Sequence, residues 1–227
     1  ALRTLGVKIA KRKNNYSVYG NGLNSFKIKR KLTRLYCGNS LTTGRLLTGL
    51  LSTIPSKFYI YGDASANRRD FMRVIEPLEK VGAQFFPRKK TLPLTIEGTS
   101  LPLAQKHVET RGSSQVKGLI LLSALSTPGI TTVEELKNKS SRTHTEIFLK
   151  KIGCDIKFKQ TKESNLIYLR GQKNLYSFNY SVKNDPSSAA YLICLSLLTP
   201  GSKLTLPRVI CNDTRIEFIK VLRKMNG

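Results

Sequence analysis

Hydrophobic and polar positions along the chain form a pattern that recurs about every 73 residues. Ser40, Ser113 and Ser187 each precede an apolar run that ends near a Pro or Gly, and a short β-like segment follows each run. Apolar runs of this length bounded by such breakers indicate buried helices. The pattern therefore predicts a helix and then a strand, three times over. The runs are RLLTGLLSTIP, VKGLILLSALSTPG and AAYLICLSLLTPG, and the segments after them are KFYIYG, ITTVEEL and SKLTLPRV.

A second element recurs with the same period. Arg69, Arg142 and Arg215 each open a segment with apolar residues three and four positions apart and a Gly or Asn at its end. This combination is typical of an amphipathic helix with a left-handed cap. Paired β segments, QFFP with LPLTIEG and DIKFKQ with NLIYLRG, follow the first two of these helices. The repeat is therefore predicted to be a βαβαββ unit within a repeated α/β architecture.

Both ends of the chain fall inside this repeat. The opening ALRTLGVKI matches the end of a second helix, with Gly6 standing where Gly82 and Gly153 stand in the later units. The last residue, Gly227, comes directly after a second helix. We therefore expect an incomplete unit at each end of the chain.

The charge balance adds an electrostatic requirement to this picture. The chain has 39 Lys and Arg against 14 Asp and Glu, a formal charge of +25. Such a balance fits a polyanion-binding protein, an enzyme of small anionic substrates, or a lysine-rich surface without a specific role. The basic residues are spread along the chain rather than gathered in one arm, which disfavours nucleic acid as the main partner.

The remaining composition excludes several classes of protein. The longest nearly apolar stretch, 189–198, is shorter than the roughly 20 residues that a transmembrane helix needs, so we expect no membrane span. The first residues show no secretory leader. The cysteines are far apart and form no CxxC motif, so reduced, mostly buried thiols are expected rather than zinc ligands or disulfides. They are Cys37, Cys154, Cys194 and Cys211.

The serines and arginines of the repeat also suggest chemistry. A Ser at the first turn of a helix places a hydroxyl beside backbone N–H groups that have no helical partner, which is an arrangement that binds phosphate or carboxylate. An Arg at the neighbouring helix adds a cation that can grip an anion at two points. Plain helix capping explains any single Ser equally well, so both interpretations remain open.

At these residues the chain resembles the enolpyruvyl transferase family, and within it the 5-enolpyruvylshikimate-3-phosphate synthases. Six segments in order match family motifs along essentially the whole chain. They are GNSLTTGRLL, GDASANRRDFMRVIEPLEKVGA, SSQVKGLILLSAL, SSRTHTEIFLKKIG, NDPSSAAYLI and NDTRIEFIKVLRKMNG.

The resemblance implies a fold, a reaction and a location. The fold is an inside-out α/β barrel of βαβαββ units, with helices inward and sheets outward. Residues 1–178 would form one domain, with a truncated first unit and two full units, and residues 179–227 would begin a second domain. A less orthodox arrangement joins residues 35–227 into one three-unit domain. The reaction transfers the enolpyruvyl group of phosphoenolpyruvate to shikimate 3-phosphate without a metal or organic cofactor, in a cytoplasmic enzyme that is monomeric when complete.

The resemblance also implies roles for individual residues. The phosphoenolpyruvate ligands would be Arg69, Gln115, Leu41, Asn39 and Arg45. The shikimate 3-phosphate ligands would be Ser113, Ser114, Gln115, Ser141, Thr42 and His144. For His144, a solvated position in the first helical turn is an equally good interpretation.

Three positions depart from the family pattern, and one of them is Asn184, which replaces a glycine of the family motif. Leu41 stands where the family has a glycine packed against phosphoenolpyruvate, and Asp70 replaces a proline and brings a negative charge to an anion site. Family segments that supply a lysine and an aspartate for catalysis have no match in the 227 residues. We therefore expect this chain alone to lack a complete catalytic set and to show no turnover. The alternative is a non-catalytic module on the same fold that binds a sugar-phosphate-like anion or a nucleic acid.

Overall fold

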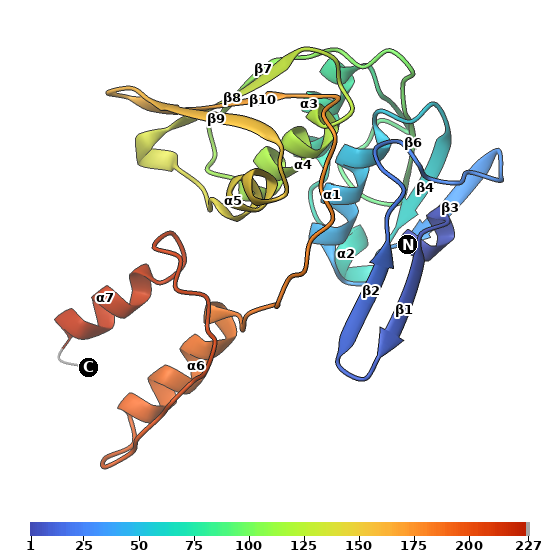
Figure 1. Ribbon diagram of the computed structural model, residues 1–227. Helices are drawn as coiled ribbons and strands as arrows, with labels where there is room; N and C mark the ends of the chain where they lie inside the picture. Colours follow the sequence, from blue (N-terminus) through green and yellow to red (C-terminus); the bar gives the residue numbers. More distant parts are fainter. Residues whose placement is uncertain (226–227) are drawn as a thin grey trace. The chain divides into compact units, whose positions relative to one another are not determined.

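The structure, a computed structural model, describes residues 1–225 and consists of two compact units (Figure 1). The first unit covers Ala1–Tyr176 and contains three sheets, one of two strands and two of four. The second unit begins at Ser177 and is built from two helices and their connections.

The first four-stranded sheet belongs to a complete βαβαββ segment. Its strands lie in the order β3-β4-β6-β5, with β3 and β4 parallel and the other two pairings antiparallel. A parallel pair needs a crossover connection, which α1 supplies. The elements are β3 (Leu32–Tyr36), α1 (Leu41–Leu51), β4 (Lys57–Tyr61), the short α2 (Ala64–Asn67), α3 (Met72–Val81), β5 (Gln84–Phe86) and β6 (Leu94–Glu97).

The second four-stranded sheet repeats this topology. Its order is β7-β8-β10-β9, again with one parallel pair and two antiparallel pairs. The predicted βαβαββ unit is confirmed in both segments. The elements are β7 (Lys106–Glu109), α4 (Ser114–Ala124), β8 (Ile130–Leu136), the 3-10 helix η2 (Lys137–Lys139), α5 (His144–Lys151), β9 (Asp155–Gln160) and β10 (Ser164–Arg170).

The first residues form a short helix and a hairpin ahead of the first four-stranded sheet. A 3-10 helix η1 (Leu2–Leu5) leads into an antiparallel hairpin of β1 (Lys8–Arg12) and β2 (Asn15–Tyr19). Gly6, Gly82 and Gly153 follow equivalent helices with φ values of +84°, +111° and +88°. Glycine adopts this left-handed conformation without a side-chain clash, so the three residues end their helices in the same way.

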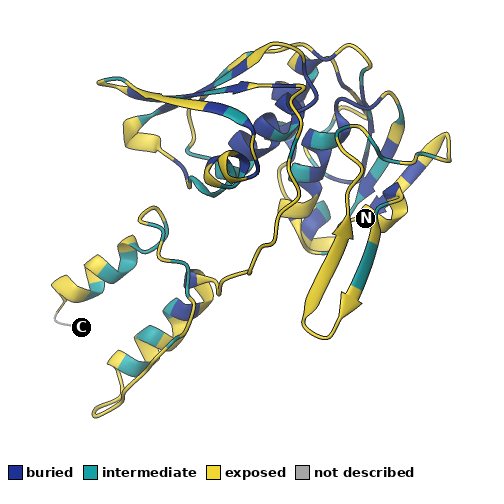
Figure 2. Cartoon of the chain, in the orientation of Figure 1, coloured by how far each residue is buried: buried dark blue, intermediate teal, exposed yellow. Residues whose placement is uncertain are grey.

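The core of the first unit lies between the helices and one face of each four-stranded sheet (Figure 2). In β3, Thr33 and Leu35 are buried while their neighbours are exposed, as expected for a sheet with one solvated face. α1 and α4 pack closely, because a β-carbon at Gly49 would lie only 2.4 Å from the Leu119 carbonyl oxygen. Helices therefore face inward and sheets outward, in agreement with the predicted fold.

The second unit differs from its sequence prediction in two respects. Its helices are α6 (Pro186–Leu197) and α7 (Glu217–Lys224), but the predicted strand SKLTLPRV forms only an isolated bridge between Val209 and Asn184. A single pair of extended segments is marginal without further strands beside it.

Cys194 and Cys211 are exposed, so only Cys37 and Cys154 fit the prediction of buried thiols. The predicted helix-ending residues Asn226 and Gly227 lie outside the described residues.

Within residues 1–225, no helix has the length and hydropathy required to cross a bilayer.

Candidate functional site

Capping hydrogen bonds fix the starts of the two central helices. At α1, the Ser40 hydroxyl oxygen accepts a bond from the Thr43 amide at 3.2 Å. At α4, the Ser113 hydroxyl oxygen accepts one from the Val116 amide at 3.4 Å. In α6 the cap residue is Asp185, two residues before the predicted Ser187, which lies in the first turn. The 73-residue spacing therefore predicts the starts of α1 and α4 to the residue and that of α6 to within two residues.

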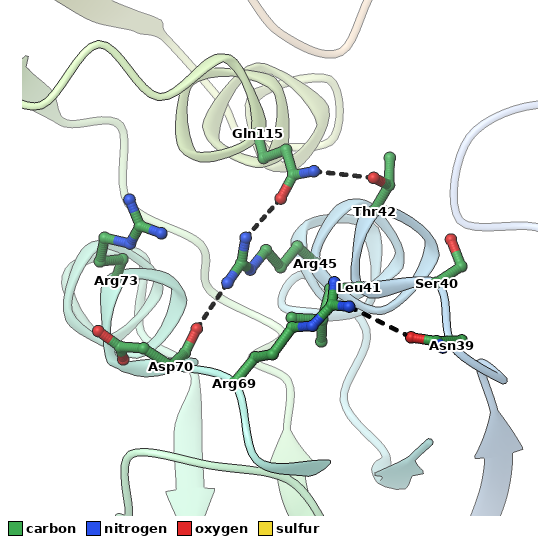
Figure 3. Close-up of a pocket in the computed structure, with 9 residues that line it drawn as sticks. All are labelled: Asn39, Ser40, Leu41, Thr42, Arg45, Arg69, Asp70, Arg73 and Gln115. Atoms are coloured by element: carbon green, nitrogen blue, oxygen red, sulfur yellow. Dashed lines mark hydrogen bonds between the residues drawn. The ribbon is translucent and has the colours of Figure 1, made fainter. Parts of the chain in front are cut away.

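An open cavity of ≈ 600 Å³ lies where the start of α1, the start of α3 and the first turn of α4 meet (Figure 3). All five side chains predicted to bind phosphoenolpyruvate line it, together with Thr42 from the shikimate 3-phosphate set. Arg73 also lines the cavity and was not predicted to belong to the site; its only signal in the sequence was its position four residues after Arg69. The lining residues are Asn39, Ser40, Leu41, Thr42, Arg45, Arg69, Asp70, Arg73 and Gln115.

A chain of hydrogen bonds crosses this cavity from α4 to α1 and to the start of α3 (Figure 3). Arg45 donates from Nη1 to Gln115 Oε1 at 2.5 Å and from Nη2 to the Asp70 carbonyl oxygen at 2.6 Å. Gln115 Nε2 donates to Thr42 Oγ1 at 2.8 Å. The amide of Gln115 therefore fixes two side chains of α1, and its position depends on the close packing of α1 against α4.

Arg69 is held more loosely than Arg45. Its Nη2 atom lies 3.4 Å from both Asn39 Oδ1 and Ser65 Oγ, near the limit for a hydrogen bond. The neighbouring Asp70 carboxylate accepts a bond from the Met72 amide at 2.7 Å and so stabilises the start of α3. The guanidinium of Arg69 can thus turn toward an anion at low cost, whereas the Asp70 carboxylate already has a backbone partner.

The cavity is electropositive because it contains three arginines and one carboxylate. Burial is the largest cause that lowers the pKa of Arg45, and the positive charge of Arg73 adds to it, while Asp70 opposes the shift. Arginine remains protonated under these conditions. Arg45 Nε is buried without a hydrogen-bond partner within the described part of the chain. The arrangement favours an anionic ligand on charge alone.

Leu41 is the first residue of α1, and its side chain is 4% exposed. It belongs to the hydrophobic core and forms part of the cavity wall at the same time. The predicted obstruction of phosphoenolpyruvate by this side chain stays a prediction.

The other predicted shikimate 3-phosphate residues gather at the starts of α4 and α5, outside the cavity lining. A β-carbon at Gly112 would lie 2.8 Å from the Lys139 carbonyl oxygen, and one at Gly118 would lie 3.3 Å from Thr145 Oγ1. The two helix starts therefore lie side by side. Ser113 and Ser114 are at the start of α4, and Ser141 and His144 are at the start of α5.

The hydroxyl of Ser141 is buried and already has a hydrogen-bond partner, which the sequence did not indicate. It is 6% exposed, and its hydroxyl donates to Glu135 Oε1 at 2.6 Å. Direct binding of a phosphate by this hydroxyl requires it to leave Glu135. The carboxylate of Glu135 was not recognised from the sequence.

Comparison with known proteins identifies relatives along the whole chain. The family profile of EPSP synthase (3-phosphoshikimate 1-carboxyvinyltransferase) matches residues 1–227. A 3-phosphoshikimate 1-carboxyvinyltransferase of Ruegeria sp. (strain TM1040) is 37% identical over 213 residues, which are 93% of this chain and 46% of the relative. One of Helicobacter pylori (strain G27) is 41% identical over 212 residues, covering 90% of this chain and 48% of the relative.

A solved structure agrees with these relatives. The EPSP synthase of Acinetobacter baumannii superposes with a TM-score of 0.82 at 34% sequence identity, over 99% of this chain and 49% of that one. The chain spans about half the length of the curated relatives it matches.

Proposed function

The chain belongs to the EPSP synthase (3-phosphoshikimate 1-carboxyvinyltransferase) family, and from this premise we propose that it binds shikimate 3-phosphate and phosphoenolpyruvate as part of an enolpyruvyl transferase. The transferred group is the enolpyruvyl moiety of phosphoenolpyruvate, and the acceptor is the 5-hydroxyl of shikimate 3-phosphate. Membership in the family supports the reaction, and the two groups of residues described above support the binding.

The electropositive cavity is the proposed phosphoenolpyruvate site. Phosphoenolpyruvate carries a phosphate and a carboxylate, and planar guanidinium groups bind both in two-point contacts. Arg69 is the main ligand in this proposal, because its present hydrogen bonds are long and easily exchanged. Arg45 is held by Gln115 and Asp70 and supplies charge from a fixed position.

The starts of α4 and α5 are the proposed site of the shikimate phosphate. Ser113 and Ser114 open α4, an 11-residue helix whose first N–H groups and dipole favour an anion. Ser141 and His144 lie at the start of the neighbouring α5, where the hydroxyl of Ser141 can exchange Glu135 for a phosphate oxygen.

Gln115 is the observation that carries the proposal. It follows Ser114 directly in the first turn of α4 and also lines the cavity, where it bonds to Arg45 and Thr42. A single side chain therefore stands between the proposed phosphate site and the proposed phosphoenolpyruvate site. This is the place where the two reacting groups must meet.

The 227 residues alone are proposed to bind ligands without turning them over. Among the described residues that line the cavity, Asp70 is the only one with a carboxylate, and this group already accepts a hydrogen bond from the Met72 amide. Removing the proton of the 5-hydroxyl requires a positioned base with a suitable pKa. The cavity provides charge and orientation, and a base is not among its lining residues.

The test is calorimetric titration of the 227-residue chain with shikimate 3-phosphate and with phosphoenolpyruvate. Ser114→Ala should weaken the affinity for shikimate 3-phosphate at least about tenfold, because a hydrogen bond to a charged group contributes about 1.5–3 kcal/mol. Ser188→Ala is the matched control, because in the sequence repeat Ser188 of α6 corresponds to Ser114 of α4. This substitution should change the affinity for shikimate 3-phosphate less than twofold. No binding by the unmodified chain, or equal losses in both variants, would refute the proposal.

The location and assembly of the protein belong to the same proposal. A biosynthetic role on small phosphorylated substrates supports a cytoplasmic protein, and the buried unpaired thiols of Cys37 and Cys154 fit a reducing compartment. We also propose that the complete enzyme is a monomer and that nucleic acid is not a partner.

A further inference from the structure

A buried lysine on α4 lies at the centre of an ion-pair cluster outside the cavity. Lys117 Nζ is 2.8 Å from Glu135 Oε2 on β8 and 2.6 Å from Glu146 Oε1 on α5. Lys117 has no exposed surface, and each of the two glutamates is 2% exposed. The cluster therefore joins three elements through charges that water and salt screen very little.

Glu135 connects this cluster to the proposed phosphate site. Its second oxygen, Oε1, accepts the N–H of Ser141 at 3.1 Å and the hydroxyl of Ser141 at 2.6 Å. One oxygen of Glu135 is thus used by Lys117 and the other by Ser141. The N–H bond fixes the backbone just before α5, and the hydroxyl bond is the one that a ligand phosphate can replace.

Stability is a poor reason for this cluster to exist. Burying charged groups costs several kcal/mol each, and apolar residues of similar volume often stabilise a protein as well or better. The cluster also has two carboxylates for one ammonium, and Glu146 Oε2 is buried without a hydrogen-bond partner among the described residues. Burial raises the pKa of Glu146. A role of Lys117 and Glu135 in fixing the position of a neighbouring group accounts better for this arrangement.

We propose that Lys117 and Glu135 are positioning residues that fix Ser141 beside the start of α4 and thereby set the affinity for the phosphate of shikimate 3-phosphate. The ligand part of this inference rests on the proposed function, whereas the fixing of Ser141 does not. Neither residue lines the cavity, so their effect should be confined to the phosphate-bearing acceptor and should not reach phosphoenolpyruvate.

The experiment compares Glu135→Gln with Glu134→Gln in the full 227-residue chain. Glu134 is the neighbouring residue on β8, but it pairs with Lys106 at 3.0 Å and does not belong to the cluster. Hydrogen exchange of the Ser141 amide and calorimetric titration with both ligands are measured. Glu135→Gln should accelerate exchange of that amide at least tenfold and weaken shikimate 3-phosphate about tenfold. The affinity for phosphoenolpyruvate should change less than twofold. Glu134→Gln should leave the exchange rate of the Ser141 amide and both affinities within twofold of their values in the unmodified chain.

Each outcome decides one part of the inference. Unchanged exchange of the Ser141 amide in Glu135→Gln overturns the positioning role, whether or not the chain binds shikimate 3-phosphate. Faster exchange of the Ser141 amide with an unchanged affinity for shikimate 3-phosphate overturns the proposed effect on the ligand. Equal losses of affinity for both ligands indicate that the protein is loosened as a whole, and they overturn the effect on the ligand as well. No binding by the unmodified chain overturns the proposed function and the ligand part together, while the exchange rate still decides the positioning part.

A second variant covers the case in which Glu135→Gln does not fold. Ser141→Ala leaves the ion pairs intact and removes only the hydroxyl. It should weaken shikimate 3-phosphate about tenfold and leave phosphoenolpyruvate unchanged, and an unchanged affinity for shikimate 3-phosphate would overturn the inference.

Discussion

The contact between α1 and α4 allows a sharp test of the packing that positions the site. A β-carbon at Gly49 would lie 2.4 Å from the Leu119 carbonyl oxygen and 2.9 Å from two further backbone atoms of that residue. Ordinary contacts begin at 3.4 Å, and backbone atoms cannot rotate away. Gly49→Ala therefore forces the two helices apart by about 1 Å, which weakens the many small dispersion contacts along them.

The size of the effect follows from two opposing contributions. Alanine in place of glycine gains about 1 kcal/mol of helix propensity, and overpacking a tight core costs about 1–3 kcal/mol or more. Because the added methyl group would meet rigid backbone, the cost of overpacking should lie at the upper end of this range. We therefore expect Gly49→Ala to lower the free energy of unfolding by about 2 kcal/mol. Gly44→Ala on the same helix is the control. Its β-carbon would meet Cys37 Sγ at 3.4 Å, so a gain of about 0.5–1 kcal/mol is expected.

Urea denaturation and thermal melting followed by circular dichroism measure both variants. One kcal/mol shifts the melting temperature of a protein of this size by about 2–4 °C, so Gly49→Ala should melt about 4–8 °C below the unmodified chain. It should also weaken ligand binding, because Arg45 and Thr42 on α1 are held by Gln115 on α4. Equal stability of the two variants would refute the close approach of these helices.

Three further predictions concern the site and its surroundings. Leu41→Gly should tighten phosphoenolpyruvate in calorimetric titration and lower the free energy of unfolding by about 4 kcal/mol, because a buried leucine leaves a cavity; unchanged phosphoenolpyruvate affinity would contradict the proposed obstruction. The raised pKa of Glu146 means that the folded state binds the proton more tightly, so its stabilising contribution is present below pH 4.5 and is lost as the pH rises through the folded pKa. In urea titrations at several pH values, Glu146→Gln should reduce the loss of unfolding free energy with rising pH. The same dependence on pH in the variant and the unmodified chain would contradict this prediction. A phosphate-release assay on the 227-residue chain should show no turnover, with or without the Leu41→Gly change, and measurable turnover would disprove that expectation.

The repeat in the sequence was sufficient to predict most of the fold of the first unit. Local signals at Ser40 and Ser113 specify helix starts, and the glycines after each second helix specify where it ends. Those signals depend on a few neighbouring residues, so they can be recognised without tertiary structure. The segment around Val209 had a suitable composition but remained unpaired apart from one bridge, because a strand also needs partners that composition does not reveal.

The candidate site was predictable in part for the same reason. Motif positions indicated Arg45, Arg69 and Gln115, and the structure brings all three to one cavity. The cluster around Lys117 was not predictable, since a lysine within an apolar run gives no sign of partners 18 and 29 positions later. Such pairings depend on the register of β8 and α5, which is determined only when the unit folds.

A crystal structure of the chain with shikimate 3-phosphate would test the proposed phosphate site directly. We expect the phosphate to lie within hydrogen-bonding distance of Ser113 and Ser114 at the start of α4, with the shikimate ring against Gln115. The Ser141 hydroxyl should have turned from Glu135 to the phosphate. A phosphate bound instead among Arg45, Arg69 and Arg73, with the starts of α4 and α5 unoccupied, would show that the proposed phosphate site is wrong.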